Sequence, residues 1–381
     1  MAPIGIYIHV PFCHQICNYC NFNRSLLDSA LVPRYVSAVE RHLGRLAARC
    51  SPGVPIEADT IYFGGGTPSV LAPADITRIL GACRASFTVA PDAEITMEAN
   101  PDSAVPEALH GYRAAGVNRL SIGVQSFRDD ELQRLSRLHD AATARRAVRD
   151  ARSAGFDNIS IDLMMWLPGQ TIDQWRESLD GLADVAPEHA SMYMLELYPN
   201  APLREEMARS HLSMTPDDDA AEMYELAMDA AAAIGMPQYE ISNVAKPGRA
   251  SRHNLKYWTD GEWLAVGPGG HSTFDGARWK SCAGIDEYVS GLEAGSDVER
   301  ERRALSPREH WEDALIMGLR LTDGVDVDGL RRNYGLDLWA RYGDHLRPYL
   351  ESGHLRAVNG RIRLSRQGML LANEVLAVFI E

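Results

Sequence analysis

The sequence has no apolar run long enough to cross a membrane. A helix needs about 20 consecutive apolar residues to span the bilayer, and the longest candidates, around residues 163–167 and 230–236, are far shorter. The first residues also lack the basic segment and the long apolar segment of a secretory signal. We therefore expect a cytoplasmic protein.

Basic residues are outnumbered by acidic ones, 38 against 52, so the formal net charge is −14. An acidic surface repels phosphate backbones, which argues against nucleic acid as a partner. The net charge excludes no class of small ligand, because the charge around a single pocket can be opposite in sign to that of the whole molecule. With 381 residues, 45% of them hydrophobic, the chain can bury a core of two or three domains, or a large barrel with an appendage.

Cysteine is scarce, and half of it is concentrated in one place. Cys13, Cys17 and Cys20 lie within eight residues, whereas Cys50, Cys83 and Cys282 are scattered. A reducing compartment disfavours structural disulfides, so the cluster indicates a metal or redox site. The scattered three are predicted to pack as small hydrophobic side chains.

The first two thirds of the chain alternate short apolar strands with amphipathic helices. Strands are predicted at residues 4–9, 60–63, 94–98, 119–124, 158–164 and 191–197. Helices are predicted at residues 32–48, 73–86, 103–115, 171–185 and 217–234, with a further helical stretch ending at residue 154. This βα repetition is typical of a parallel sheet or barrel.

The rest of the chain divides into two further patterns. Residues 236–290 are rich in Gly, His, Trp and Tyr with little periodicity, which predicts a strand-and-loop elaboration that closes one side of the barrel. Residues 291–381 predict a small winged-helix-like domain. Its elements are helices at 307–320, 327–332, 337–352 and 366–380, and a hairpin of 355–358 with 361–364 around an Asn-Gly turn. The first domain is then residues 1–235.

Cys13, Cys17 and Cys20 form a C-x3-C-x2-C array directly after the first predicted strand. Three thiolates on one loop can hold three irons of a [4Fe–4S] cluster and leave the fourth iron open to a small ligand. A structural zinc site is the alternative, with His9 or His14 as the fourth ligand. The spacing alone leaves both interpretations open.

The same array resembles the signature of the radical S-adenosylmethionine (radical SAM) superfamily. In that superfamily the amino acid end of SAM occupies the open iron, and electron transfer to the sulfonium yields a 5′-deoxyadenosyl radical. Residues 62–68 (YFGGGTP) resemble the superfamily's glycine motif, where the backbone must approach a ligand closely. The resemblance implies an α/β fold with a partial (β/α)6 barrel.

Further motifs resemble the coproporphyrinogen-oxidase-like branch of this superfamily, in family order along almost the whole chain. They are residues 7–13 (YIHVPFC), 97–101 (MEANP), 123–127 (GVQSF), 137–139 (RLH) and 162–171 (DLMMWLPGQT). Four later segments are similar to the heme chaperone HemW family, which implies a C-terminal domain of that type over residues 291–381. They are residues 239–243, 252–258, 267–272 and 318–322.

The resemblance also implies roles for residues at the carboxyl ends of strands, where a parallel barrel gathers its ligand chemistry. SAM at the cluster is implied to contact Tyr7, Gly65 and Glu98. A second SAM, as in the oxidase relatives, is implied at Tyr19, Gly66, Thr67, Gln125, Arg137 and Asp162. Considered by themselves, these residues could equally make hydrogen bonds along the barrel rim. Glu196 is a weaker candidate, because its surroundings differ from those of the relatives.

His253 opens the element HNLKYW at residues 253–258. Imidazole is a standard axial ligand of heme iron, and Tyr257 and Trp258 could supply a flat apolar surface for the macrocycle. A histidine beside aromatic residues is more often a packed, hydrogen-bonded core residue, so the residues alone leave both interpretations open. The resemblance implies heme at His253, with His271 as a second candidate.

Two features separate a heme chaperone from a radical decarboxylase of coproporphyrinogen III. The oxidases continue the cluster motif with a fourth cysteine, whereas Asn21 and Phe22 follow Cys20 here. The oxidases also carry an N-terminal extension that covers the site, whereas the first strand is predicted to begin at Ile4. Without that cover a porphyrinogen would be poorly shielded from solvent.

We therefore expect a heme-binding chaperone that carries a [4Fe–4S] cluster and SAM, with no catalytic residue assigned. The implied partners are heme, an electron donor and heme-accepting proteins, among them membrane-associated respiratory proteins. The alternative is a radical SAM enzyme of the same branch, either an oxygen-independent coproporphyrinogen III dehydrogenase or a two-SAM methyltransferase or cyclopropanase. Residues 165–166 and 195–199 differ from the sequence common among the chaperones. Since they lie near the expected pocket, the difference concerns the identity of the ligand more than the fold.

Overall fold

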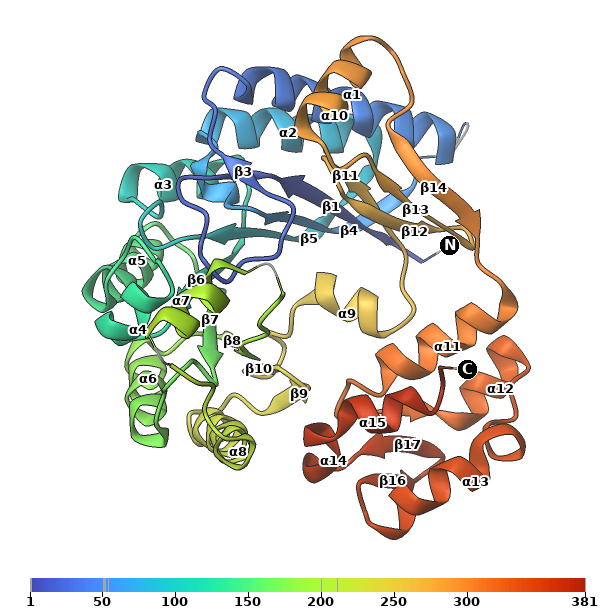
Figure 1. Ribbon diagram of the computed structural model, residues 1–381. Helices are drawn as coiled ribbons and strands as arrows, with labels where there is room; N and C mark the ends of the chain where they lie inside the picture. Colours follow the sequence, from blue (N-terminus) through green and yellow to red (C-terminus); the bar gives the residue numbers. More distant parts are fainter. Residues whose placement is uncertain (1, 51–52, 54, 200, 211, 381) are drawn as a thin grey trace.

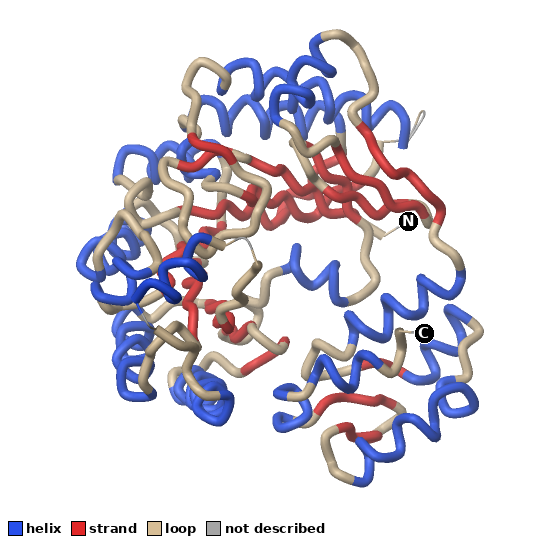
Figure 2. The backbone as a smooth tube through the Cα atoms, viewed as in Figure 1, coloured by secondary structure: helices blue, strands red, loops and turns tan. Residues whose placement is uncertain are grey.

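A single curved sheet organises most of the computed structural model, which describes residues 2–50, 53, 55–199, 201–210 and 212–380. Within this part of the chain the sheet has 12 strands in the order β14-β13-β12-β11-β1-β4-β5-β6-β7-β8-β10-β9. Figure 2 shows the strands following a curve, with most of the helices along its outer side and a smaller unit below it.

The middle of the sheet consists of six parallel strands that are adjacent in chain order. They are β1 (Ile4–Val10), β4 (Glu57–Gly65), β5 (Thr88–Ala99), β6 (Arg119–Gln125), β7 (Ile159–Met165) and β8 (His189–Met194). All six strands predicted from the sequence are present. This confirms the predicted α/β fold with a parallel, partial barrel.

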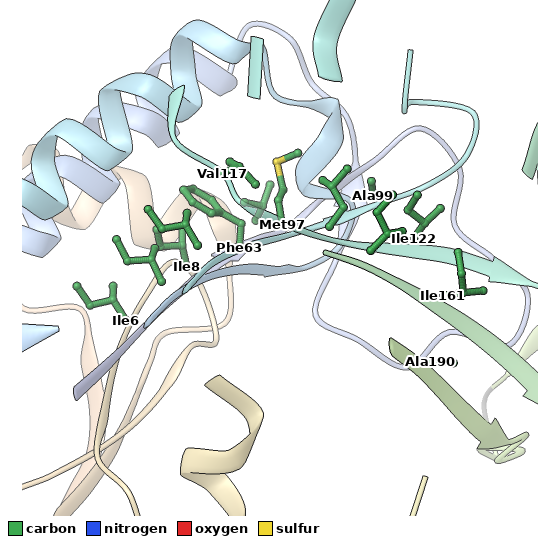
Figure 3. Close-up of a cluster of buried hydrophobic side chains, with 14 of the residues drawn as sticks. Ile6, Ile8, Phe63, Met97, Ala99, Val117, Ile122, Ile161 and Ala190 are labelled. Atoms are coloured by element: carbon green, nitrogen blue, oxygen red, sulfur yellow. The ribbon is translucent and has the colours of Figure 1, made fainter. Parts of the chain in front are cut away.

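Helices cover the outer face of these strands (Figure 1). They are α1 (Val32–Cys50), α2 (Pro73–Ser86), α3 (Pro106–Ala115), α4 (Asp129–Arg134), α5 (Ala141–Ser153), α6 (Ile172–Val185) and α8 (Asp217–Ala233). The helix α7 (Pro202–Ser210) lies instead beside the cysteine loop, where the Leu203 amide donates to the Asn18 carbonyl. Apolar side chains of the strands pack beneath them, as Figure 3 shows for Ile6, Ile8, Phe63, Met97 and Ile161. Because strand side chains alternate between faces, the intervening residues point into the barrel.

The inward-facing residues of the same strands are largely polar. Tyr7, Tyr62, Glu98, Ser121 and Asp162 alternate with the apolar residues of the outer face. A barrel interior lined this way is unsuited to be a packed apolar core. The alternation therefore separates an outer core, which holds the fold together, from an inner polar wall that can hold a ligand.

The segment predicted as a strand-and-loop elaboration contains more regular structure than expected. Its elements are β9 (Gln238–Glu240), β10 (Asn243–Ala245), α9 (Arg252–Trp258), β11 (Trp263–Val266), β12 (His271–Phe274), β13 (Ala277–Ser281) and α10 (Ile285–Glu293). β11 pairs in parallel with β1, and β10 pairs antiparallel with β8. The segment therefore extends the sheet at both ends, and α9 is a helix that periodicity does not predict.

Two other predicted helices are each broken in two. The helical stretch ending at residue 154 is α4 and α5, because Asp140 caps α5 by accepting a hydrogen bond from the Thr143 amide. The last predicted helix is α14 (Arg366–Leu370) and α15 (Ala372–Ala377). The helix α7 was not predicted. Among the described residues no helix is long and apolar enough to cross a membrane.

The C-terminal part forms a separate small unit. It contains α11 (Pro307–Gly318), α12 (Val327–Tyr334), α13 (Leu338–Glu351) and a small sheet of β15 (Val325–Asp326), β17 (Arg361–Leu364) and β16 (Leu355–Val358). The predicted Asn359-Gly360 hairpin is present, with both residues at positive φ. The strand β14 (Glu299–Ala304) still pairs with β13 of the large sheet. We therefore propose that the C-terminal unit begins after β14 rather than at residue 291.

Candidate functional site

A cavity of about 400 Å³ opens at the carboxyl ends of the parallel strands. The three clustered cysteines line it, together with most of the residues predicted to contact SAM. These lining residues are Cys13, Cys17, Cys20, Tyr19, Gly65, Gly66, Thr67, Glu98, Gln125, Arg137, Asp162 and Glu196. Tyr7, His253 and His271 were also predicted as site residues, and they do not line it.

The cysteines belong to a loop whose two ends are held by a short parallel pair of strands, β2 (Phe12–Cys13) and β3 (Ser25–Leu26). The Thr67 hydroxyl donates to Cys13 Sγ over 3.4 Å, and Arg137 Nη1 donates to Cys17 Sγ over 3.5 Å. Burial raises the pKa of the Cys13 and Cys20 thiols, while the charge of Arg24 acts to lower both pKa values. Donors and cations at these sulfurs suit bound thiolates.

The same geometry bears on the choice between an iron–sulfur cluster and zinc. No group of three His, Cys, Asp or Glu side chains in the described ranges converges as the ligands of one metal ion would. His9, one candidate fourth zinc ligand, uses Nε2 on the Asn23 carbonyl at 2.7 Å and Nδ1 on the Tyr7 hydroxyl at 3.2 Å. His14 is half exposed and lies beside Asp102. In a [4Fe–4S] cluster each thiolate binds a different iron, so three cysteines around one cavity mouth fit the cluster.

Glu98 lies inside the cavity at the end of β5. Its carboxylate accepts from the Tyr62 hydroxyl at 2.9 Å and from the Gly65 amide at 3.1 Å. Burial, together with the charge of Asp162, raises the pKa of Glu98 to about 7, although these two hydrogen bonds act in the opposite direction. A buried carboxylate of this kind is stabilised by a cationic ligand or by ligand hydroxyl groups.

Asp162 occupies the corresponding position on β7. The Ser121 hydroxyl donates to its two oxygens at 3.1 and 3.2 Å. Burial raises the pKa of Asp162 to about 6, and nearby arginines act to lower it. Two partly neutralised carboxylates therefore line one cavity, which favours a ligand that carries positive charge.

Arg137 connects the cysteine loop to the barrel rim. Its Nη2 donates to Asn100 Oδ1 at 2.7 Å and to the Gly123 carbonyl at 2.6 Å, while Nη1 reaches Cys17. Asn100 in turn donates to Thr67 Oγ1 at 3.2 Å. Asn100 lies within residues 97–101 (MEANP), and the motif alone predicts no role for this side chain. This network fixes the loop relative to the ends of β4, β5 and β6.

Gln125 ends β6 in a left-handed backbone conformation, with φ of 68°. Few residues other than glycine adopt this conformation, and it often marks a functional site. The pairing of β6 with β7 is irregular between Gly123 and Gln125. The irregularity places the Gln125 side chain on the cavity wall.

The glycines after β4 are required by the protein's own chain. A Cβ atom on Gly66 would lie 2.8 to 2.9 Å from backbone atoms of Val10, Pro11 and Phe12. Gly65 has φ of 110°, and its Cβ would meet the His9 ring. Close approach of the cysteine loop therefore explains these glycines before any ligand is considered.

Tyr7 lies deeper than the residues of the cavity wall. Its ring stacks near those of Tyr62 and His253, with centroids 6.1 and 6.3 Å away, and burial raises its pKa. Its hydroxyl contacts His9 at 3.2 Å. In this structure Tyr7 supports the wall and does not form part of its surface.

His253 is 1% exposed and lies behind the cavity on α9. Its Nδ1 pairs with Thr60 Oγ1 at 2.8 Å and its Nε2 with the Tyr257 hydroxyl at 2.9 Å. Burial lowers its pKa to about 3. Both ring nitrogens are therefore engaged, and the next residue, Asn254, lines the cavity instead. To ligate heme iron, His253 would have to lose one of these two partners.

The helix α9 closes the inner end of the barrel, and in Figure 1 it lies between the large sheet and the C-terminal helices. Glu94 accepts from the amides of Arg252 and His253 at 3.2 and 3.1 Å, and Ser251 accepts from the Asn254 amide. His271 is exposed on β12 and does not line the cavity.

The chain is similar to known proteins along almost its whole length. The family model for the radical SAM superfamily matches residues 7–182, and the model for the HemN C-terminal domain matches residues 305–371. The superfamily match implies a [4Fe–4S] cluster and SAM as cofactors.

Several bacterial relatives bear the name heme chaperone HemW. The Bacillus subtilis protein is 35% identical over 375 residues, 98% of each chain, and the Escherichia coli protein is 38% identical over 100% of this chain and 99% of its own. A Bos taurus relative named radical S-adenosyl methionine domain-containing protein 1, mitochondrial, is 34% identical over 98% of this chain and 86% of its own.

Among solved structures, coproporphyrinogen III oxidase (HemN) from Escherichia coli matches with a TM-score of 0.87 over 99% of this chain and 90% of its own. Since the two sequences are 22% identical, this match concerns the fold alone. The full-length similarity to the bacterial relatives decides the family. The chain belongs to the HemW family of radical SAM proteins.

Proposed function

We propose that the protein is a heme chaperone, which binds heme and passes it to acceptor proteins. The observation that carries this proposal is the similarity to proteins named heme chaperone HemW, which extends over 98% or more of the chain at 35 and 38% identity. An electron donor and heme-accepting proteins are the partners that go with this role. We also propose a cytoplasmic location.

In this proposal Cys13, Cys17 and Cys20 hold the [4Fe–4S] cluster. The Thr67 hydroxyl and the Arg137 guanidinium contact two of the three sulfurs, and such contacts stabilise thiolates and tune a cluster. A bound cluster and SAM would supply redox chemistry at the cavity mouth. The chain's own part is to fix the loop through Arg137, Asn100 and Gly123.

SAM would occupy the cavity beside the cluster. Gly65 and Glu98 would contact the SAM held at the cluster, and Tyr7 would position Tyr62 and His9 behind it. Tyr19, Gly66, Thr67, Gln125, Arg137 and Asp162 would contact a second SAM. The two buried carboxylates support this assignment, because SAM carries a sulfonium and an ammonium group that both carboxylates would neutralise.

Heme would be ligated by His253 after the Tyr257 hydroxyl leaves Nε2. The aromatic rings of Tyr7, Tyr62 and Tyr257 lie around this histidine. His271 is the second candidate ligand, and its exposed position on β12 needs no such rearrangement.

Heme transfer tests the proposed function. Cluster-reconstituted protein loaded with one equivalent of heme would be mixed anaerobically with an apo-cytochrome of the b type, and the Soret band of the acceptor would be followed. Heme-loaded serum albumin at the same concentration is the control donor. We expect the acceptor to fill faster from this protein than from albumin; equal or slower filling would contradict a chaperone role.

A further inference from the structure

Arg119, the first residue of β6, is a buried cation with no assigned role. Its side chain is 1% exposed and lines the cavity. Its Nε atom is buried and finds no hydrogen-bond partner among the described residues. A guanidinium has five N–H donors, and burying such a group without acceptors is costly. An arginine in this state indicates that a ligand supplies the acceptor.

The register of the sheet places Arg119 below the SAM candidates. Arg119 is opposite Thr96 on β5, whereas Ser121 is opposite Glu98. Since side chains two residues apart share a face, Arg119 points to the same interior as Ser121, one step farther from the cysteine loop. It therefore belongs to the floor of the cavity.

The carboxylates above Arg119 already have partners of their own. Glu98 accepts from Tyr62 and Gly65, and Asp162 accepts from Ser121. The charge of Arg119 lowers the pKa of both carboxyl groups, but only as one of the smaller influences on each. The charge of Arg119 therefore acts on both carboxyl groups, while its Nε still has no acceptor among the described residues.

The opposite side of the floor offers a further polar group and is otherwise closed. Asn254, near the start of α9, also lines the cavity. Behind it, the ring nitrogens of His253 are bound to Thr60 and Tyr257, and those of His189 are bound to Ser160 and Tyr239. The ring nitrogens of both histidines are therefore engaged, whereas the buried Arg119 Nε has no partner at the cavity lining.

We propose that Arg119, with Asn254, forms an inner subsite that binds a carboxylate group of the ligand. A planar carboxylate matches the guanidinium fork with two parallel hydrogen bonds. Two ligands of the proposed function carry this group: a second SAM, through its amino acid end, and heme, through its propionate side chains. The inference rests on those ligands and not on delivery of heme to an acceptor.

The test compares Arg119→Met and Arg119→Lys with the unaltered, cluster-reconstituted protein. The probes form two pairs that differ by the carboxylate: SAM with decarboxylated SAM, and hemin with hemin dimethyl ester. We expect Arg119→Met to weaken binding of the carboxylated member of one pair by about tenfold or more, the usual cost of losing a charged hydrogen bond. The probe without the carboxylate should bind Arg119→Met and the unaltered protein with equal affinity. Arg119→Lys should reduce the affinity for the carboxylated probe by a smaller factor than Arg119→Met.

Titration at pH 8.5 lies above the pKa values of Glu98, about 7, and Asp162, about 6, in the unaltered protein. Arg119→Lys keeps the positive charge that lowers both pKa values, so its loss of binding reports the forked hydrogen bonds and not protonation of the carboxylates. Arg113→Met is the matched control, since Arg113 is exposed on α3 and bonds the Gly155 carbonyl. A weakened affinity for SAM alone would identify the ligand carboxylate as that of SAM, and a weakened affinity for hemin alone as a heme propionate. The subsite would be overturned if, in both pairs, the ratio of the affinities for the two probes were the same in Arg119→Met as in the unaltered protein.

If the Met variant does not fold, the Lys variant gives the same comparison, because a lysine cannot form the forked pair of hydrogen bonds. Failure of the unaltered protein to bind hemin would count against the proposed function. The SAM pair would still decide whether Arg119 binds a carboxylate.

Discussion

Individual side chains of the site are held by hydrogen bonds to neighbouring side chains and backbone groups. Arg137 holds the Gly123 carbonyl, Tyr62 and Gly65 hold Glu98, and Tyr257 holds His253. Such contacts preorganise the cavity wall before a ligand arrives. They also allow single substitutions to separate the roles proposed for neighbouring residues.

The three clustered cysteines should be individually required for the iron–sulfur cluster. We expect Cys13→Ala, Cys17→Ala or Cys20→Ala to lose the cluster, because each thiolate would bind its own iron. The measurement is iron content and absorbance after anaerobic reconstitution. Cys83→Ala is the control, since Cys83 lies on the buried face of α2 in the apolar core. Full iron content in any of the three variants would contradict the ligand assignment.

SAM binding should tighten as pH rises from 5.5 to 7.5. Burial raises the pKa of Glu98 to about 7 and that of Asp162 to about 6, so both carboxyl groups lose their protons within this range. The ionised forms attract the cationic ligand, which therefore binds better at the higher pH. Calorimetric titration of cluster-loaded protein measures the change.

Glu98→Gln keeps the shape of the side chain but cannot ionise. The pH dependence in this variant should fall to the part due to Asp162, and SAM binding at pH 7.5 should weaken. A variant with the slope of the unaltered protein would show that Glu98 does not face SAM.

His253 and Tyr257 give opposite predictions for heme. His253→Ala removes the proposed ligand and should weaken heme binding, whereas Tyr257→Phe frees Nε2 from its 2.9 Å hydrogen bond and should strengthen it. Soret titrations of the two variants provide the measurement, with His271→Ala as control. Should Tyr257→Phe bind heme no better than the unaltered protein, and His271→Ala bind it worse, the ligand would be His271.

At the scale of elements, the strands and helices of the barrel were largely predictable. Apolar alternation located all six parallel strands, and Pro73 marked the first turn of α2. Asn359 and Gly360 located the hairpin. The helix α9 was missed because its seven residues are too few for a clear period, and because its start depends on Ser251 and Glu94, which are distant in sequence from one another.

The sequence predicts which residues belong to the candidate site, but not how deeply each of them is buried. The motifs named the residues around the cysteine loop, and strand alternation indicates which side chains share a face. Neither reveals that Tyr7 and His253 lie behind the cavity surface or that Arg119 lies beneath Glu98. Depth depends on strand register and on α9, which fills the inner end of the barrel.

The cap of α9 gives a prediction at this scale. Ser251→Ala removes the side-chain acceptor for the Asn254 amide, and loss of such a cap typically costs about 1 kcal/mol of unfolding free energy. Urea unfolding would measure it, with Ser290→Ala as control, since Ser290 is exposed on α10. If the two variants unfold at the same urea concentration, the cap contributes nothing to the stability of the barrel floor.

In the whole molecule, a buried ion pair near α9 joins the barrel to the C-terminal unit. Glu240 of β9 is fully buried and accepts from Arg320, which follows α11, at 2.7 and 2.8 Å. Its other oxygen accepts from the Ser242 amide and the Asn243 side chain. The last strands of the sheet are thereby tied to the C-terminal helices. The floor of the cavity and the C-terminal unit are parts of one structure.

Heme binding through His253 is tested most directly by an anaerobic heme titration of the cluster-reconstituted protein, followed at the Soret band. Because hemin adheres to many apolar surfaces, the same titration is made on His253→Ala. If His253 ligates heme in a chaperone, binding is saturable near one equivalent and the substitution weakens it. Weak binding that is the same in both proteins would contradict this role and favour a SAM-dependent enzyme, for which release of 5′-deoxyadenosine is the expected sign.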